Sequence, residues 1–251
     1  MTKKMFFIFL LLIFSICLSG CMKSVTTESA TLLAHYEFED NLSDSTGNFS
    51  DGIVIGTKIG ETGGSVTYTD GVVGKAVYLD GASGIQLPDN LIHSYKYSIA
   101  FWLKADQLTN YTPAFFGCVK NKTNEWLSIP PGGLAAFGGR FQIWSNYNNG
   151  STWFDGLTNV NLEVGKWYHI AVVVNEGELS VYINGEKQAL DTRINGQTSL
   201  QALFPDLFSN KDAIFTIGVN YWDTPFKGLI DDLRIYSGVL TDSEVLSLAS
   251  K

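Results

Sequence analysis

From Leu32 onward, the chain consists of short apolar or alternating runs separated by clusters of Gly, Asn and Asp. Side chains of a β-strand alternate between two faces, so runs of this length and spacing predict strands joined by tight turns. No helical period is sustained until the last dozen residues. The pattern predicts an all-β domain, a sandwich or a barrel, with one short helix at its C-terminal end.

Nine segments are predicted strands, each bounded by turn residues. They span residues 32–38, 76–79, 97–103, 114–119, 140–145, 167–174, 179–183, 214–218 and 228–236. Asn184-Gly185 predicts a type I′ hairpin, because both central residues of that turn need a positive φ. Thr241-Asp242-Ser243-Glu244 has the spacing of a capping box, which predicts a helix that begins after Thr241.

The first 21 residues have the features of an export signal. A basic start containing Lys3 and Lys4 is followed by an apolar run over residues 5–18 and then by Ser19-Gly20-Cys21. This run is too short to span a bilayer, which takes about 20 apolar residues, so we expect a cleaved secretory signal. Cysteine directly after Ser-Gly resembles the lipobox of bacterial lipoproteins, which implies cleavage before Cys21 and its acylation. An ordinary cleaved signal with an incidental cysteine is the alternative.

The predicted organisation has three parts: a lipoprotein signal peptide over residues 1–20, a flexible tether over 21–31 that begins with lipidated Cys21, and one domain over 32–251. The tether is predicted because this stretch is polar with few bulky groups. Contact with a membrane is expected through the lipid alone. The expected location is therefore the bacterial cell envelope, at the outer membrane or the cell surface.

Charge and cysteine content narrow the function further. The formal net charge is −8, and the predicted signal carries Lys3 and Lys4 without any acid, so the remaining chain is more negative still. This sign argues against nucleic acid and against an anionic membrane surface as partners. Cys118 is the one cysteine beyond Cys21, so no disulfide within the domain is expected. Its apolar neighbours predict a buried structural thiol.

Five segments match, in order, the pattern of one superfamily. They are residues 35–42 with Asp44 and Gly47, residues 71–81, residues 97–104, residues 167–172 running into 179–185, and residues 226–236 running into Leu240, Glu244 and Leu248. Together they resemble a laminin-G-like domain of the concanavalin A-like lectin/glucanase superfamily. The resemblance implies a jelly-roll sandwich of two antiparallel sheets, often with a structural calcium ion.

A calcium site is therefore expected around Asp231. Strict alternation along residues 228–236 places Asp231 on the same face as Leu233 and Ile235, where an ionised carboxylate must be paired, hydrogen-bonded or bound to metal. The family's calcium site uses the Asp of a Gly-x-Ile-Asp motif, which maps onto Asp231, together with oxygens from the first strand and from a Gly turn. The resemblance places these further ligands at Glu37, Glu39 or Asp40 in the first strand, and at Asp80 and Gly81 in the turn. Alternatively, Asp231 only accepts backbone hydrogen bonds.

Aromatic and amide side chains gather between Asp106 and Val164. The aromatic residues there are Tyr111, Trp126, Phe137, Trp144, Tyr147, Trp153 and Phe154, and the polar ones include Asn121, Asn124, Arg140, Asn146, Asn148 and Asn149. Tyr221-Trp222-Asp223 can add a second wall, because loops at one end of a sandwich cluster. Sugars expose apolar C–H faces edged by hydroxyls, so flat rings beside polar side chains predict a glycan site.

We assign this site to eight residues: Trp126, Arg140, Trp144, Asn146, Tyr147, Trp153, Tyr221 and Trp222. The alternative is that some of these rings pack beneath long loops. Trp102 and Trp167 fall in strands where the family fills the space between the sheets, so both are expected in the core.

The sequence favours binding over catalysis. Hydrolases of this superfamily carry a Glu-x-Asp-x-x-Glu strand, and Glu37-Phe38-Glu39-Asp40 lacks both its central Asp and its final Glu. The predicted function is a non-catalytic lipoprotein that binds an extracellular glycan or polysaccharide on a calcium-supported sandwich. A structural or adhesive module that binds an envelope protein is the first alternative, and a glycoside hydrolase or polysaccharide lyase is the second.

Overall fold

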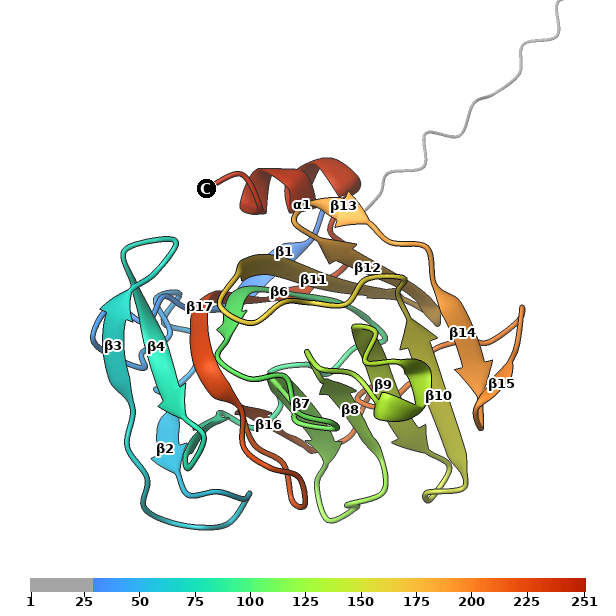
Figure 1. Ribbon diagram of the computed structural model, residues 1–251, viewed down its shortest axis with the longest axis horizontal. Helices are drawn as coiled ribbons and strands as arrows, with labels where there is room; N and C mark the ends of the chain where they lie inside the picture. The colour runs from blue at the N-terminus through green and yellow to red at the C-terminus, as the bar shows by residue number, and fades with distance from the viewer. Residues whose placement is uncertain (1–28) are drawn as a thin grey trace, which may run out of the picture.

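The computed structural model describes residues 29–251, which form a sandwich of two stacked β-sheets (Figure 1). The predicted signal peptide, Cys21 and most of the tether 21–31 lie outside the described residues. Every strand pair is antiparallel. The fold is therefore the expected all-β jelly-roll sandwich with a short C-terminal helix.

One sheet has eight strands. In spatial order they are β13 (Glu186–Lys187), β12 (Glu178–Ile183), β11 (Trp167–Asn175), β6 (Lys96–Ala105), β17 (Lys227–Ser237), β4 (Lys75–Asp80) and β3 (Thr67–Asp70), with β1 (Thr31–Tyr36) also paired to β17. The turn between β12 and β13 is the predicted hairpin, and Asn184 and Gly185 both have positive φ, 51° and 82°.

The other sheet has nine strands. In spatial order they are β15 (Gln197–Thr198), β14 (Asp191–Ile194), β10 (Thr152–Leu157), β9 (Gln142–Tyr147), β8 (Trp126–Ile129), β7 (Phe115–Val119), β16 (Ala213–Ile217), β5 (Gly84–Leu87) and β2 (Ile53–Ile55). A 3₁₀ helix, η1 (Ala135–Phe137), lies in the loop between β8 and β9.

The main core lies between the two sheets and consists of alternate side chains from both. Phe101 of β6 is buried there, as are Phe115 and Phe215, whose ring centroids are 6.1 Å apart. Burying such side chains is the main favourable contribution to folding, and truncating one of them to Ala costs about 3–5 kcal/mol.

A second apolar cluster lies under helix α1 (Asp242–Leu248), on the outer side of the eight-stranded sheet (Figure 1). Val245 is fully buried there against a cluster that includes Ala171 and Tyr182. The predicted capping box is confirmed: the Glu244 backbone N–H donates to Thr241 Oγ1, and the Thr241 N–H donates to Glu244 Oε2 at 2.7 Å.

Strand β17 contains a β-bulge, which changes the prediction for Asp231. The pairing of β17 with β6 shifts register between Asp231 and Arg234, and Asp232 has a φ of 51°. Ile230, Leu233 and Ile235 all lie in the core between the sheets. The prediction that Asp231 shares a face with Leu233 and Ile235 is therefore wrong, because the extra residue reverses the alternation and Asp231, next to Ile230, faces outward.

Trp102 and Trp167 also lie on the outer face of the eight-stranded sheet, contrary to their predicted place in the core. Trp102 is buried beside His169, with ring centroids 5.2 Å apart. Trp167 is partly exposed, and Lys104 Nζ lies 5.3 Å from its ring centroid. Their neighbours in each strand face inward, so alternation directs both tryptophans outward.

Candidate functional site

The candidate site lies on the outer face of the nine-stranded sheet and begins with the alternation of strand β8. Leu127 and Ile129 enter the core between the sheets, so Trp126 and Ser128 face outward. The sheet therefore presents a ring and a hydroxyl side by side on its outer face.

Neighbouring strands β9 and β10 continue this face. Trp144 lies opposite Ser128 in the β8–β9 pairing, and Asn146 lies opposite Trp126. Trp153 of β10 is in turn opposite Asn146. Cross-strand partners have Cβ atoms about 4.5–5.5 Å apart, so the register alone gathers three indole rings from three strands.

The rings pack in a defined geometry. Trp144 and Trp153 are stacked, with ring centroids 5.2 Å apart and an angle of 21° between their planes. Trp126 meets Trp144 edge to face at 4.6 Å, and Tyr111 lies 5.4 Å from Trp144. Trp126 is only 4% exposed, whereas Trp153 is 37% exposed. Trp126 therefore supports the neighbouring rings, and Trp153 presents its surface to solvent.

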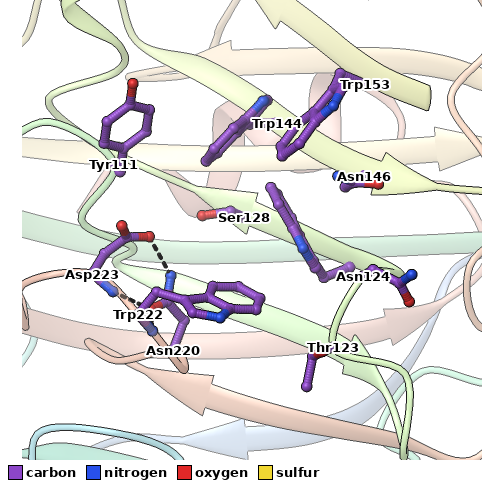
Figure 2. A pocket seen from close by; sticks show the side chains of 11 residues that line it. Tyr111, Thr123, Asn124, Ser128, Trp144, Asn146, Trp153, Asn220, Trp222 and Asp223 are labelled. Atoms are coloured by element: carbon purple, nitrogen blue, oxygen red, sulfur yellow. Dashed lines mark hydrogen bonds between the residues drawn. The ribbon is translucent and has the colours of Figure 1, made fainter. Parts of the chain in front are cut away.

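The rings line a pocket of about 520 Å³. Figure 2 shows Tyr111, Trp144 and Trp153 in a row on one side and Trp222 on the opposite side. The lining residues are Tyr111, Thr123, Asn124, Trp126, Ser128, Trp144, Asn146, Trp153, Asn220, Trp222 and Asp223. A pocket of this size and mixture is typical of small-molecule sites.

Two buried polar groups of the lining have no partner within residues 29–251. Ser128 is 1% exposed and Asn146 is 4% exposed, and neither Ser128 Oγ nor Asn146 Oδ1 has a hydrogen-bond partner there. Leaving a buried polar group unpaired costs about 1–3 kcal/mol. Both atoms are therefore suited to hydrogen-bond a polar ligand in the pocket.

Asp223 is the charged residue of the pocket lining, and Asn220 holds it in place. Asn220 Nδ2 donates to Asp223 Oδ2 at 2.7 Å, and Asn220 Oδ1 accepts from the backbone N–H groups of Trp222 and Asp223 at 2.8 Å each. Burial raises the pKa of Asp223, against the opposing effects of the Asn220 hydrogen bond and the Lys58 charge. Asn220 therefore fixes the backbone at Trp222 and the carboxylate of Asp223.

An apolar cluster adjoins the pocket on the same outer face of the sheet. Phe116 and Cys118 of β7 pack with Trp126 in a buried cluster. Burial raises the pKa of the Cys118 thiol to about 12, so it is protonated at neutral pH. The prediction of a buried structural cysteine is confirmed.

The structure brings five of the eight predicted glycan residues into this pocket: Trp126, Trp144, Asn146, Trp153 and Trp222. The other three lie outside the lining. Arg140 instead pairs with Asp191, with 3.2 Å between Nη2 and Oδ2. Tyr147 packs against the core between the sheets, and Tyr221 packs against the apolar cluster of Phe116, Cys118 and Trp126. The strand parity of β9 explains Tyr147, because Tyr147 follows outward-facing Asn146.

Sequence reasoning did not assign six lining residues to the site. Tyr111, Asn124 and Asp223 were among the aromatic and polar residues noted for their composition, whereas Thr123, Ser128 and Asn220 were not. Ser128 alternates with Trp126 along β8, so the parity of a correctly bounded strand identifies it. Asn220 is brought to the pocket by a loop from a distant part of the chain, and local pattern gives no indication of it.

The predicted calcium ligands do not converge in the structure. Asp231 is fully buried, and its Oδ2 accepts from the backbone N–H groups of Val72 and Val73 at 2.7 and 2.9 Å. A Cβ at Gly71 would lie 2.5 Å from the same oxygen, so only glycine allows this approach. Asp231 Oδ1 has no partner among the described residues. Burial raises the pKa of Asp231 to about 6, against the lowering effect of these N–H groups.

The remaining predicted ligands are occupied elsewhere. Glu39 accepts from the Lys75 backbone N–H at 3.0 Å, and Asp40 pairs with the Lys75 ammonium. Asp80 accepts from the Ala82 N–H at 2.8 Å, and Gly81 lies in that same turn. Glu37 is exposed, with Oε1 3.6 Å from His35 Nδ1. Within residues 29–251, no group of three or more His, Cys, Asp or Glu side chains is placed to hold a metal.

This donor set does not form the shell of six to eight oxygens that Ca²⁺ requires. The one feature that fits a cation is the unpartnered Asp231 Oδ1. Calcium binding stays a prediction.

Comparison with known proteins identifies the family. A sequence model of the concanavalin A-like lectin/glucanases superfamily matches residues 79–246. The chain belongs to this superfamily. A solved structure of domain 4 of AbnA, a GH43 extracellular arabinanase from Geobacillus stearothermophilus, in complex with arabinotriose, is 45% identical with a TM-score of 0.78. The match covers 89% of this chain and 100% of that domain.

Two less similar solved structures share the fold alone. The binding domain of Paraclostridial Mosquitocidal Protein 1 is 22% identical, with a TM-score of 0.55, and the match covers 87% of this chain and 51% of that one. Trypanosoma rangeli sialidase is 14% identical, with a TM-score of 0.52, and the match covers 87% of this chain and 32% of that one. No curated protein sequence matches the chain.

Proposed function

We propose that this superfamily member is a non-catalytic domain that binds an arabinan-type oligosaccharide in the aromatic pocket. The observation that carries the proposal is the stacked pair Trp144 and Trp153, which lies beside unpartnered Ser128 Oγ and Asn146 Oδ1. A sugar ring has apolar C–H faces edged by hydroxyl groups. The indole planes match the faces, and the two unpartnered polar atoms match the hydroxyls.

The identity of the sugar is supported by the arabinanase domain. That domain is 45% identical over its whole length and was solved with arabinotriose. The pocket volume of about 520 Å³ also suits a small oligosaccharide.

The absence of catalysis is supported by the placement of carboxylates. Glycoside hydrolases use two carboxyl groups that flank the scissile bond. Asp223 is the one carboxylate among the residues that line the pocket. A binding pocket, rather than a hydrolytic site, is the function that this lining supports.

The place of action proposed for the domain is the bacterial cell envelope, where acylated Cys21 would attach it. This part of the proposal rests on the sequence of residues 1–21. Within residues 29–251, no helix is long and apolar enough to cross a membrane. If Cys21 carries the lipid, the Cys21→Ser variant is released from the membrane fraction of a bacterial host, and retention of that variant contradicts the proposal.

Calorimetric titration of the purified protein with arabinotriose tests the binding proposal. Trp153→Ala and Trp222→Ala remove exposed rings from opposite walls, so each should weaken binding about tenfold or more, which corresponds to about 1.4 kcal/mol. Trp167→Ala is the matched control, because Trp167 is a partly exposed tryptophan on the other sheet. Its affinity should equal that of the wild type.

Three outcomes contradict the proposal. They are no heat of binding with arabinotriose, unchanged affinity in both pocket variants, and release of arabinose on prolonged incubation. If the domain is an adhesive module, it recognises a protein surface rather than a sugar, and arabinotriose should give no heat of binding. The adhesive alternative then becomes the better explanation.

A further inference from the structure

A second cavity adjoins the aromatic pocket. It has a volume of about 460 Å³ and shares Tyr111, Trp144 and Trp153 with the first cavity. The same three rings therefore form a wall with one cavity on each side. The ring row that Figure 2 shows at the edge of the first cavity is this wall.

Asp155 is the buried polar group of the second cavity. It lies on β10, opposite Trp144 of β9 and Arg193 of β14, and it is 3% exposed. Arg193 does not hydrogen-bond it, because the guanidinium donates to Asp191 Oδ2 through Nε and Nη2 at 3.2 and 2.9 Å. The described residues form no hydrogen bond to the Asp155 carboxylate, which leaves it as a free acceptor.

Apolar and amide side chains also line the second cavity. Phe137 of η1 lines it, and the Arg193 guanidinium carbon lies 5.3 Å from the centroid of this ring. Asn195 also lines the cavity, and its Oδ1 accepts from the Trp153 backbone N–H at 2.8 Å. The cavity thus combines a ring, a fixed amide and an unpaired carboxylate, which is the mixture that a sugar requires.

We propose that the second cavity is a further subsite for the same glycan, in which Asp155 accepts hydrogen bonds from sugar hydroxyls and Phe137 contacts the ring. The inference rests on the proposed function of the first cavity. The glycan crosses the wall of Tyr111, Trp144 and Trp153 and occupies both cavities. The protein therefore binds long internal stretches of the glycan more tightly than a short oligosaccharide.

The charges of the two cavities select a neutral glycan. Asp223 in the first cavity and Asp155 in the second are the charged side chains among the described residues that line them. A uronic acid or sulfated sugar would place its own negative charge near these carboxylates with no Lys or Arg in the lining to offset it.

Calorimetric titrations with arabinotriose and arabinohexaose test the subsite. In the wild type, the hexaose should bind about tenfold more tightly than the triose, because only the hexaose reaches both cavities. Asp155→Asn and Phe137→Ala should each reduce this difference while leaving the affinity for the triose unchanged. Trp222 lines the first cavity alone, so Trp222→Ala should lower the affinity for the triose and the affinity for the hexaose by the same factor. An oligogalacturonide of six sugar residues, which is negatively charged, should bind neither the wild type nor any of these variants.

The outcomes separate the two proposals. Equal affinity for triose and hexaose in the wild type overturns the second subsite and leaves the first intact. The second subsite is also overturned if Asp155→Asn and Phe137→Ala both still bind the hexaose more tightly than the triose by the wild-type factor. Loss of triose binding in Phe137→Ala also contradicts the assignment, because Phe137 does not line the first cavity. If the wild type binds neither ligand, both proposals fail.

Discussion

His35 Nε2 lies 2.6 Å from Asp232 Oδ1, and this contact joins the first strand of the sandwich to the bulge in β17. Arg234 Nη2 donates to the same oxygen at 2.9 Å, and Lys251 Nζ donates to Oδ2 at 2.8 Å. Burial alone would raise the pKa of Asp232, but the hydrogen bonds from His35 and Lys251 and the charge of Arg234 hold it well below its usual value. One carboxylate therefore connects the N-terminal strand, the bulge and the last residue of the chain.

Replacing buried Asp232 with Asn should destabilise the domain by up to about 3–5 kcal/mol, because it removes the counter-charge of Arg234 and Lys251, which are both partly exposed. Asn also tolerates the positive φ at this position, so the loss reports on the interactions rather than on the backbone. Urea unfolding followed by tryptophan fluorescence measures the change.

Asp89→Asn is the control for this prediction. Asp89 pairs with Lys120 at 2.8 Å on the surface, where such pairs contribute about 0–1 kcal/mol. Equal losses in the two variants would contradict the role assigned to Asp232.

The tryptophans of the pocket should separate into supporting and binding residues. Trp126→Ala removes a ring that is 4% exposed and packs against Phe116, Trp144 and Trp153, so it should cost about 3–5 kcal/mol of stability and also reduce binding. Trp153→Ala removes a ring that is 37% exposed, so it should reduce binding at a much smaller cost in stability.

Thermal unfolding and arabinotriose titration, performed on the same protein samples, measure both effects. Comparable destabilisation by the two variants would show that Trp153 is a packing residue rather than part of a sugar platform.

The fold was predictable because its signals are local. The hairpin at Asn184-Gly185 needs two positive φ values, and the helix after Thr241 needs a reciprocal cap, and both appear as predicted. The face of β17 on which Asp231 lies was not predictable in the same way. A β-bulge at Asp231–Asp232 depends on which strands pair with β17, and β6 and β1 are far away in the sequence.

The candidate site was predictable only in part, for a related reason. Tryptophans clustered with Asn indicated a sugar site, and Trp126, Trp144 and Trp153 do meet. Composition alone could not distinguish outward-facing Asn146 from its inward-facing neighbour Tyr147. That distinction requires the exact strand boundaries and register, because a shift by one residue exchanges the two faces of a strand.

Calcium binding through Asp231 can be tested by thermal unfolding with and without a chelator. An ion that binds only the folded state at 100 times its dissociation constant adds about 2.7 kcal/mol, so chelation should lower the Tm of protein purified with calcium. Asp231→Asn should remove this sensitivity, and Asp89→Asn serves as a control because Asp89 is not among the predicted ligands and pairs with Lys120 at the surface. A wild-type melting curve that chelator and added calcium leave unchanged would rule calcium out as a stabilising ligand.

Asp155 should make stability depend on pH in a way that Asp155→Asn abolishes. Burial, with a smaller opposing effect of Arg193 and a further raising effect of Asp191, raises the pKa of Asp155 from 3.8 to about 6. The folded state therefore holds this proton more tightly than the unfolded state. The associated stability is fully present below about pH 4 and is lost as the pH rises through about 6. At pH 7.5 the ionised, buried carboxylate weakens the fold by up to about 3 kcal/mol.

Urea unfolding of the wild type and of Asp155→Asn at pH 4 and pH 7.5 measures this difference. The variant should be more stable than the wild type at pH 7.5, and the gain should be small at pH 4, where Asp155 is largely protonated in the folded state. Asp89→Asn, a surface substitution, should show no such gain at pH 7.5. A variant that is less stable than the wild type at pH 7.5 would mean that the ionised carboxylate has a stabilising partner in the protein. Asp155 would then be unavailable to a sugar hydroxyl, and the second subsite would lose its acceptor.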